Sequence, residues 1–297
     1  MTPLPTLRQL QFFMALVRRE SFSKAAEDCL VSQSTLSSAI KEMEALLDKQ
    51  LVDRTTRAFA LTPTGIEVAT RAPLVLAAAE DMAFAAVASR PLEGEFHLGV
   101  IPTIAPFLVP ALSARLHDAF PKLRLYLRED LTDALIERLS AGLIDAAILA
   151  LPYDIPGAES IEISTDPFWF VCSHDHPLAT RDVLSPADLT ECELLLLEDG
   201  HCLRDHAIDA CGLAQRRAGD NFAATSLLTL TEMARAGIGA TLLPDMAIAS
   251  GIAQSSGLSV IPFTMPRPER KIGIAWRRGS SRVDEANEIA AIAKQCF

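Results

Sequence analysis

The hydrophobic pattern at the start of the chain has helical spacing and predicts three helices in succession. The first covers residues 7–19, where every third or fourth position is apolar. A second follows at 23–29 with Ser23 as its N-cap, and a third begins after Ser32, whose hydroxyl suits a cap. The expected buried positions are Leu10, Phe13, Met14 and Val17, then Phe22, Ala25, Ala26 and Cys29, then Leu36, Ile40, Met43 and Leu47.

The opposite face of the third helix carries short polar side chains near its N-terminus. Such groups approach phosphates and base edges closely, and the helix dipole attracts phosphate. Residues 51–61 then predict a β-wing, with two arginines placed to hold phosphate. A small helical bundle with an ordinary polar face is the alternative. The candidate DNA-contacting residues are Ser32, Gln33, Ser34, Thr35, Ser37, Lys41, Arg54 and Arg57.

Residues 64–89 form an alanine-rich apolar seam with heptad-like spacing. As a helix they would span about 40 Å at 1.5 Å per residue, and Pro73 predicts a kink or local break. A seam so apolar needs a partner, which favours dimerisation; packing on the chain's own C-terminal part is the alternative. The seam consists of Val68, Ala72, Val75, Ala79, Met82 and Ala86.

From residue 95 onward, short apolar runs alternate with helical patterns. Strands are expected at 96–100, 123–127 and 145–150, with helices at 108–120 and 132–141. This rhythm predicts a parallel α/β sheet, whose ligands lie at the carboxyl ends of strands. Thr103 and Thr132 fall just beyond such ends. Later apolar runs at 168–172, 194–197, 241–243 and 271–276 complete a second lobe and a return to the first.

Charge and cysteine usage limit the possible functions. Of the net −11 over 297 residues, residues 1–62 contribute +1 and the remainder −12, so DNA contact belongs to the N-terminal segment. The longest apolar run, 72–79, is far shorter than the ~20 residues that span a membrane, so a soluble cytoplasmic protein is expected. The six cysteines contain no C-x-x-C pair, which argues against a zinc ribbon or thioredoxin-type site, and no metal or cofactor is expected.

The densest reactive chemistry lies in residues 198–206, with sequence EDGHCLRDH. A thiolate is the reactive form of cysteine, and nearby His and Arg side chains lower a thiol pKa. His201 and Arg204 flank Cys202, which makes it the best candidate for a reactive thiol. From this adjacency alone, an inert buried cysteine remains the simpler interpretation.

Several motifs in order resemble the LysR-type transcriptional regulators. They are FSKAA at 22–26, VSQSTLS at 31–37, RTTR at 54–57 and LTPTG at 61–65. The resemblance implies a winged helix-turn-helix DNA-binding domain at 1–62 and a linker and dimerisation helix at 63–90. It also implies a two-lobed, periplasmic-binding-protein-like α/β effector domain at 91–297. Promoter DNA and self-association, as a dimer of dimers, would follow.

Residues 198–206 together with Cys211 resemble the redox centre of the hydrogen-peroxide-sensing members of that family. The resemblance implies that Cys202 is the peroxidatic cysteine, that Cys211 resolves it, and that Thr103, Thr132, His201 and Arg270 surround the peroxide. His206 and Asn221 depart from the pattern, and Cys29, Cys172, Cys192 and Cys296 are taken as structural thiols. A LysR-type regulator of a small metabolite and a thiol peroxidase are the alternatives.

The spacing of this cysteine pair predicts a conformational switch. Residues 201–211 have helical periodicity, and nine positions on a helix separate two Cα atoms by ~13.5 Å. A disulfide tolerates at most about 7 Å. Disulfide formation would therefore unwind part of this helix.

Overall fold

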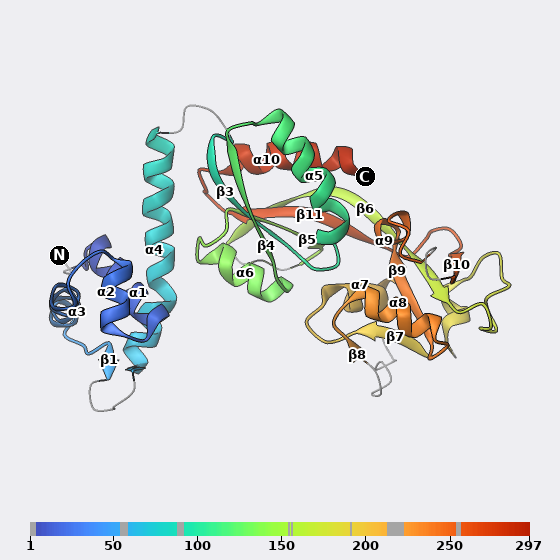
Figure 1. Cartoon of the computed structure of the whole chain (residues 1–297), viewed down its shortest axis with the longest axis horizontal. Coiled ribbons are helices and arrows are strands. Elements are labelled where there is room, and N and C mark those ends of the chain that lie inside the picture. The colour runs from blue at the N-terminus through green and yellow to red at the C-terminus, as the bar shows by residue number, and fades with distance from the viewer. Residues whose placement is uncertain are drawn as a thin grey trace. The chain divides into compact units, whose positions relative to one another are not determined.

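The computed structural model describes residues 4–53, 59–87, 92–153, 155, 157–190, 192–212, 223–253 and 257–297. The chain divides into two compact units, residues 1–88 and 89–297, shown in Figure 1. Among the described helices, none is long and apolar enough to cross a membrane.

The first unit is a helix bundle with a small two-stranded sheet. Thr6 caps the first helix through a reciprocal capping box with Gln9, and Ser32 caps the third by accepting from the Thr35 N–H at 3.1 Å. The second helix begins one residue earlier than expected, with Ser21 rather than Ser23 as its N-cap; Ser23 lies in its first turn, where its hydroxyl pairs with that of Ser21. The elements are α1 (Leu7–Arg19), α2 (Phe22–Asp28), α3 (Gln33–Leu47), β1 (Val52–Asp53), β2 (Ala60–Leu61) and α4 (Pro63–Val87).

The core of this unit forms where the apolar stripes of α1 and α3 meet. Phe13, Leu36 and Ile40 are fully buried, as the spacing predicted, whereas Met14 and Val17 are only half-buried at its edge. A buried carboxylate joins the core to the wing: Glu44 Oε1 accepts the backbone N–H groups of Leu51 and Val52 at 2.9 and 3.1 Å. The base of the predicted wing is therefore fixed to the third helix.

Helix α4 runs 25 residues without a break, so the local break considered at Pro73 does not occur. Proline removes only one hydrogen bond of the ladder, and the flanking turns continue. Ala72 of the predicted seam is buried in the core of the first unit. Another part of the helix leaves large apolar side chains exposed, namely Ile66, Leu74, Val75 and Met82. Ser89, the expected end of the seam, lies outside the described residues.

The second unit contains one sheet of nine strands within its described part. The sheet is mixed rather than purely parallel: β3 pairs in parallel with β4 and β5, but β11 is antiparallel to both β5 and β6. The first-lobe elements are β3 (Gly94–Val100), α5 (Ala105–Ala119), β4 (Leu123–Glu129), α6 (Thr132–Ser140), β5 (Ala146–Leu151) and α10 (Val283–Ala293), followed by a short turn of helix at Lys294–Cys296.

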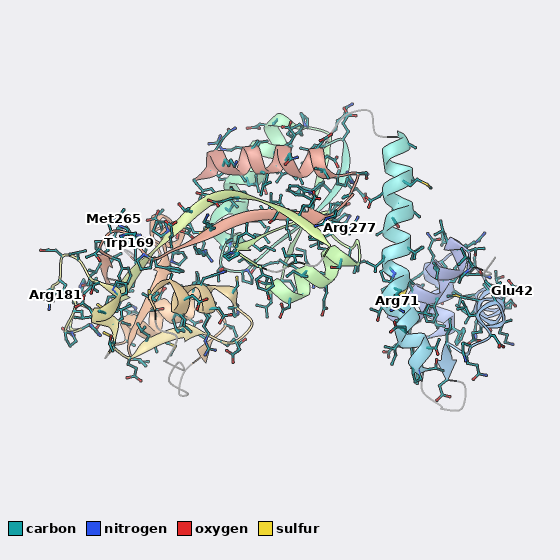
Figure 2. The ribbon with its side chains drawn as sticks, turned by 180° about the vertical axis from the view of Figure 1, so that it is seen from behind. Glu42, Arg71, Trp169, Arg181, Met265 and Arg277 are labelled. Atoms are coloured by element: carbon teal, nitrogen blue, oxygen red, sulfur yellow. The ribbon has the colours of Figure 1, made fainter. Side chains whose placement is uncertain are left out.

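Two long strands, β6 (Ala158–Cys172) and β11 (Glu269–Arg277), join the lobes. They arch side by side from one lobe to the other, so that Arg277 of β11 lies in the first lobe and Trp169 of β6 in the second (Figure 2). The second-lobe elements are a 3-10 turn at Pro186–Leu189, β7 (Leu194–Leu197), α7 (Cys202–Ala210), β8 (Ala223–Ala224), α8 (Leu227–Arg235), β9 (Ala240–Pro244), α9 (Asp245–Ala249) and β10 (Ser259–Pro262).

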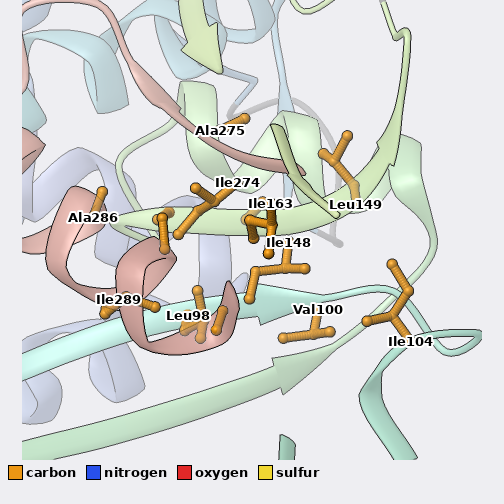
Figure 3. Close-up of a cluster of buried hydrophobic side chains, with 14 of the residues drawn as sticks. Leu98, Val100, Ile104, Ile148, Leu149, Ile163, Ile274, Ala275, Ala286 and Ile289 are labelled. Atoms are coloured by element: carbon orange, nitrogen blue, oxygen red, sulfur yellow. The ribbon is translucent and has the colours of Figure 1, made fainter. Parts of the chain in front are cut away.

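Each lobe has its own hydrophobic core. In the first, Leu98 and Val100 of β3 lie beside Ile148 of the neighbouring strand β5, and Ile274 and Ile289 pack in the same cluster (Figure 3). In the second, aromatic residues of β6 pack with α7, α8 and β9. This division matters for the redox chemistry because the two cysteines of interest belong to different cores.

Candidate functional site

Helix α7 carries the predicted redox pair at its two ends. His201 is the N-cap, Cys202 is the first helical residue and Cys211 is the C-cap, so the helix expected at 201–211 is confirmed. Gly200 turns the chain into it with a φ of +95°, a conformation that favours glycine. Leu203 and Ala207 anchor the helix in the second-lobe core.

Cys202 crosses from its own lobe into the core of the other. Its side chain is buried and packs in the first-lobe cluster, although α7 belongs to the second lobe. Burial raises the pKa of the Cys202 thiol, and three groups oppose that rise: the Thr132 hydroxyl, the charge of Arg270 and the backbone N–H of Ala150. These groups favour the thiolate and offset part of the cost of burying it, although the pKa stays above its usual value.

The positive charge near the thiol comes from a rigidly held guanidinium. Arg270 is 1% exposed. Its Nη1 donates to Thr103 Oγ1 at 2.9 Å and its Nη2 to the Thr103 carbonyl at 3.0 Å, while Nε donates to Asp166 Oδ2 at 3.0 Å. The second oxygen of Asp166 accepts the backbone N–H of Met246 at 3.1 Å. Burial raises the pKa of Asp166 and the Arg270 charge opposes this rise. Arg270 is thereby fixed between β11, β6 and the loop after β3.

Two buried polar atoms beside Cys202 have no hydrogen-bond partner among the described atoms, Thr132 Oγ1 and His206 Nδ1. His206 is one helical turn after Cys202 and therefore on the same face of α7. Burial lowers its pKa, and the nearby Arg270 charge lowers it further. A neutral ring nitrogen and a hydroxyl without partners are suited to a small hydrogen-bonding molecule.

The two residues that flank Cys202 in sequence differ in their surroundings. His201 is buried and its pKa is lowered by that burial, so its imidazole is neutral at pH 7. The Arg204 side chain forms an ion pair with Asp199. Of the predicted cationic neighbours, Arg270 is the one whose charge acts on the Cys202 pKa; a role for Arg204 at the thiol stays a prediction.

Cys211 lies in the second-lobe core and is 3% exposed. Burial raises its pKa to about 12, so at neutral pH it is a thiol and a poor nucleophile. Along the intact helix its Cα is ~13.5 Å from that of Cys202. The two sulfurs are thus separated both by distance and by the cores that hold them, and both cysteines are reduced.

Sequence reasoning missed several residues of this site. Asp166 lies in a polar stretch of β6 that showed no strand pattern, and only the fold brings it to Arg270. Tyr153 donates to Asp133 Oδ1 at 2.6 Å, and this hydrogen bond raises the Tyr153 pKa to about 12. Thr132 and Asp133 are consecutive, so the Tyr153 contact braces the start of α6. No spacing signal in the sequence could have found these contacts. In the described part of the chain, no group of His, Cys, Asp and Glu could hold a metal ion.

The first unit presents the predicted DNA-contacting face. Gln33, Ser34, Thr35 and Lys41 are exposed and Ser37 is half-buried, while the Ser32 hydroxyl caps the helix. A hollow of about 590 Å³ lies between the starts of α1 and α3, and Arg8 and Gln9, which the sequence pattern did not single out, line it. Glu42 of α3, labelled in Figure 2, also lines it. Arg54 and Arg57 lie outside the described residues.

Comparison with known proteins identifies both parts of the chain. Residues 7–66 match the bacterial regulatory helix-turn-helix protein, lysR family, and residues 89–295 match the LysR substrate binding domain. The regulator EstR of Acinetobacter baylyi is 38% identical, covering 99% of this chain and 98% of EstR. The dual regulator OxyR of Escherichia coli is 38% identical over 92% of this chain and 90% of OxyR.

Solved structures agree with these matches. A full-length OxyR variant from Pseudomonas aeruginosa superposes with a TM-score of 0.80 at 31% identity, covering 99% of both chains. A hydrogen-peroxide-bound OxyR mutant from Corynebacterium glutamicum superposes with a TM-score of 0.68 at 34% identity, covering 100% of this chain and 94% of the other.

Proposed function

The chain belongs to the LysR family of bacterial transcriptional regulators, and from this we propose that it senses hydrogen peroxide through Cys202 and changes transcription in response. The observation that carries the proposal is the setting of Cys202. It is a buried thiol beside a fixed guanidinium, a hydroxyl and a backbone N–H, within a chain that also carries a helix-turn-helix unit. The OxyR relatives and the peroxide-bound OxyR structure support the choice of signal.

The first chemical step is oxidation of Cys202. Its thiolate attacks one oxygen of hydrogen peroxide, the O–O bond breaks, and a sulfenic acid and hydroxide form. Thr103, Thr132 and Arg270 surround the peroxide, and both the Arg270 charge and the Thr132 hydroxyl stabilise the anionic sulfur. His201 contributes a neutral imidazole, and Arg204 stabilises the start of α7 through Asp199.

The second step joins the two cysteines. Cys211 attacks the oxidised sulfur of Cys202, the S–S bond forms and the S–O bond breaks with release of hydroxide. Because ~13.5 Å must become less than about 7 Å, α7 unwinds in this step. Cys202 leaves the first-lobe core or Cys211 leaves the second, so packing between the lobes changes. This packing change is the signal that the effector domain transmits.

The first unit delivers the signal to promoter DNA. The N-terminus of α3 enters the major groove with Gln33, Ser34 and Ser37 near base edges, and Lys41, Arg54 and Arg57 contact phosphates. The exposed apolar side chains of α4, among them Leu74 and Met82, pair with the same helix of a second subunit. A dimer of such dimers is the assembly we propose. The chain acts in the cytoplasm, where its DNA is, and as a sensor rather than an enzyme.

The proposal is tested in cells that lack the chromosomal copy. Wild type, Cys202→Ser and, as a matched control, Cys296→Ser are expressed, and transcription next to the DNA sites that the protein occupies is followed after peroxide. We expect the response in wild type and Cys296→Ser and its loss in Cys202→Ser. An unchanged response in Cys202→Ser refutes the proposal. Continuous peroxide consumption by purified protein with a thiol reductant would instead indicate a thiol peroxidase.

A further inference from the structure

A second pair of cysteines, Cys172 and Cys192, lies within the core of the second lobe. Cys172 is the last residue of β6 and is fully buried. Cys192 is half-buried and packs against the same cluster of apolar side chains. Both are reduced in this structure. The sequence analysis took both as structural thiols, because neither has neighbours comparable with those of Cys202, and twenty positions separate them.

The strand register brings the two cysteines into the same part of the second lobe. In the sheet β6 lies between β10 and β9. Cys172 is opposite Ser259 of β10, and the β6–β9 register, in which Val171 is opposite Thr241, places Cys172 next to Ala240. Ala240 is also opposite Leu194 of β7. Since neighbouring strands are ~4.8 Å apart, Cys172 and the start of β7 flank Ala240 within about 10 Å of each other.

The segment 184–194 then carries Cys192 back across β6. It begins beside β10, where the Leu184 N–H donates to the Pro262 carbonyl at 2.9 Å, and it ends beside β9, where Glu193 O accepts from the Ala240 N–H at 3.0 Å. Because β6 lies between those strands, the segment must cross it. Leu189 is buried in the core on this path, and the Cys192 N–H donates to the Leu189 carbonyl at 3.1 Å.

The electrostatics of the two thiols agree with this geometry. Burial raises the pKa of Cys172 to about 11, and the neighbouring Cys192 raises it as well, as one ionisable sulfur does to another close by. The Cys192 thiol donates to the Asp188 carbonyl at a sulfur–oxygen distance of 3.5 Å. Cys192 is the more accessible of the two and therefore the one that an oxidant meets first.

We propose that Cys172 and Cys192 form a second disulfide, independent of the Cys202 and Cys211 pair, when the protein meets excess oxidant. The bond would tie the crossing segment to the end of β6, just before β7 leads into α7. With peroxide, the Cys192 thiolate attacks one oxygen, and a sulfenic acid and hydroxide form. The Cys172 thiolate then displaces hydroxide from that sulfur. Two thiols and one hydrogen peroxide thus give one disulfide and two waters.

The second disulfide forms slowly. Cys172, with a pKa of about 11, has on the order of 100-fold less thiolate at neutral pH than an ordinary thiol, which slows its attack on the oxidised Cys192. In the sequence set by the proposed function, Cys202 reacts first under limiting peroxide, and the second pair reports severe or prolonged oxidation. The inference rests on the proposed function only for the order of these two events.

The test uses the full-length Cys202→Ser/Cys211→Ser protein, oxidised with excess hydrogen peroxide or, in parallel, with diamide, a thiol oxidant that takes two electrons and two protons from a thiol pair. Free thiols are then alkylated and the linked peptides mapped by mass spectrometry. We expect one peptide pair that joins Cys172 to Cys192, absent when Cys192→Ser is added. Adding Cys29→Ser instead is the matched control and should leave the linked pair unchanged.

Recovery of both residues as alkylated thiols, or oxidation of Cys192 to a sulfinic acid without a link, overturns the proposal. So does a link from Cys192 to Cys29 or Cys296. The diamide arm separates this inference from the proposed function. A Cys172–Cys192 link with diamide supports the second pair even if wild-type protein fails to join Cys202 to Cys211 with peroxide.

Discussion

Stabilising α7 should make the Cys202–Cys211 disulfide harder to form. Asp209 is an exposed helical residue near the C-terminal end of α7, where an acidic side chain opposes the helix dipole. Asp209→Ala gains up to about 0.7 kcal/mol of helix propensity and about 0.3 kcal/mol from the dipole. If α7 unwinds on oxidation, all of this gain belongs to the reduced state.

A gain of about 1 kcal/mol lowers the equilibrium constant for disulfide formation about fivefold, which makes the reduction potential about 20 mV less negative. The potential is measured by equilibrating the protein in glutathione buffers and quantifying the disulfide. The matched control is Asn287→Ala, an exposed change of similar propensity on α10, which should leave the potential unchanged. An unchanged potential in Asp209→Ala, with its helix gain verified by thermal unfolding of the reduced form, would refute unwinding of α7.

Three further changes probe the thiol, His206 and the wing. Replacing the buried pair together, Arg270→Gln with Asp166→Asn, removes the positive charge near Cys202 and raises the Cys202 pKa. Each unit of raised pKa lowers the thiolate fraction about tenfold, so oxidation by peroxide should slow at least tenfold. Stopped-flow measurement of thiol loss follows the rate. Because burial lowers the pKa of His206, this side chain binds a proton more tightly in the unfolded chain, near pH ~6.5, than in the folded chain. Stability should therefore fall as pH drops below about 6.5, and urea unfolding should show a smaller fall in His206→Gln; equal falls would contradict the assignment. Arg54→Ala should weaken binding to specific and nonspecific DNA alike and reduce the salt slope by about one, whereas a loss confined to one sequence would argue for base contact.

The sequence predicted best those elements whose stability comes from their own periodicity. Helix α1 and the cap at Ser32 follow from local spacing, and α7 follows from Leu203 and Ala207 at helical intervals. The mixed sheet did not, because β6 is half polar where it passes between the lobes. This part of β6 is held by backbone pairing with β11, and its side chains show no regular alternation of apolar and polar residues that would predict a strand.

The candidate site shows the same division. Cys202 and its neighbours in sequence were identifiable from a local string, but Asp166, which holds Arg270, lies in another strand. His201 next to Cys202 predicted a cationic neighbour, whereas burial makes it neutral. The charge that acts on the thiol comes from 68 positions further along the chain, a placement that only tertiary structure supplies. The Cys172 and Cys192 proximity was missed for the same reason.

The central claim is that one molecule of peroxide joins Cys202 to Cys211. The most direct measurement adds one equivalent of hydrogen peroxide to the reduced full-length protein, alkylates the remaining thiols and maps every cysteine by mass spectrometry. The account predicts the loss of two thiols per peroxide and a single linked peptide pair containing Cys202 and Cys211, with the other four cysteines alkylated. Recovery of Cys202 as an alkylated thiol, or its linkage to any cysteine other than Cys211, would contradict it.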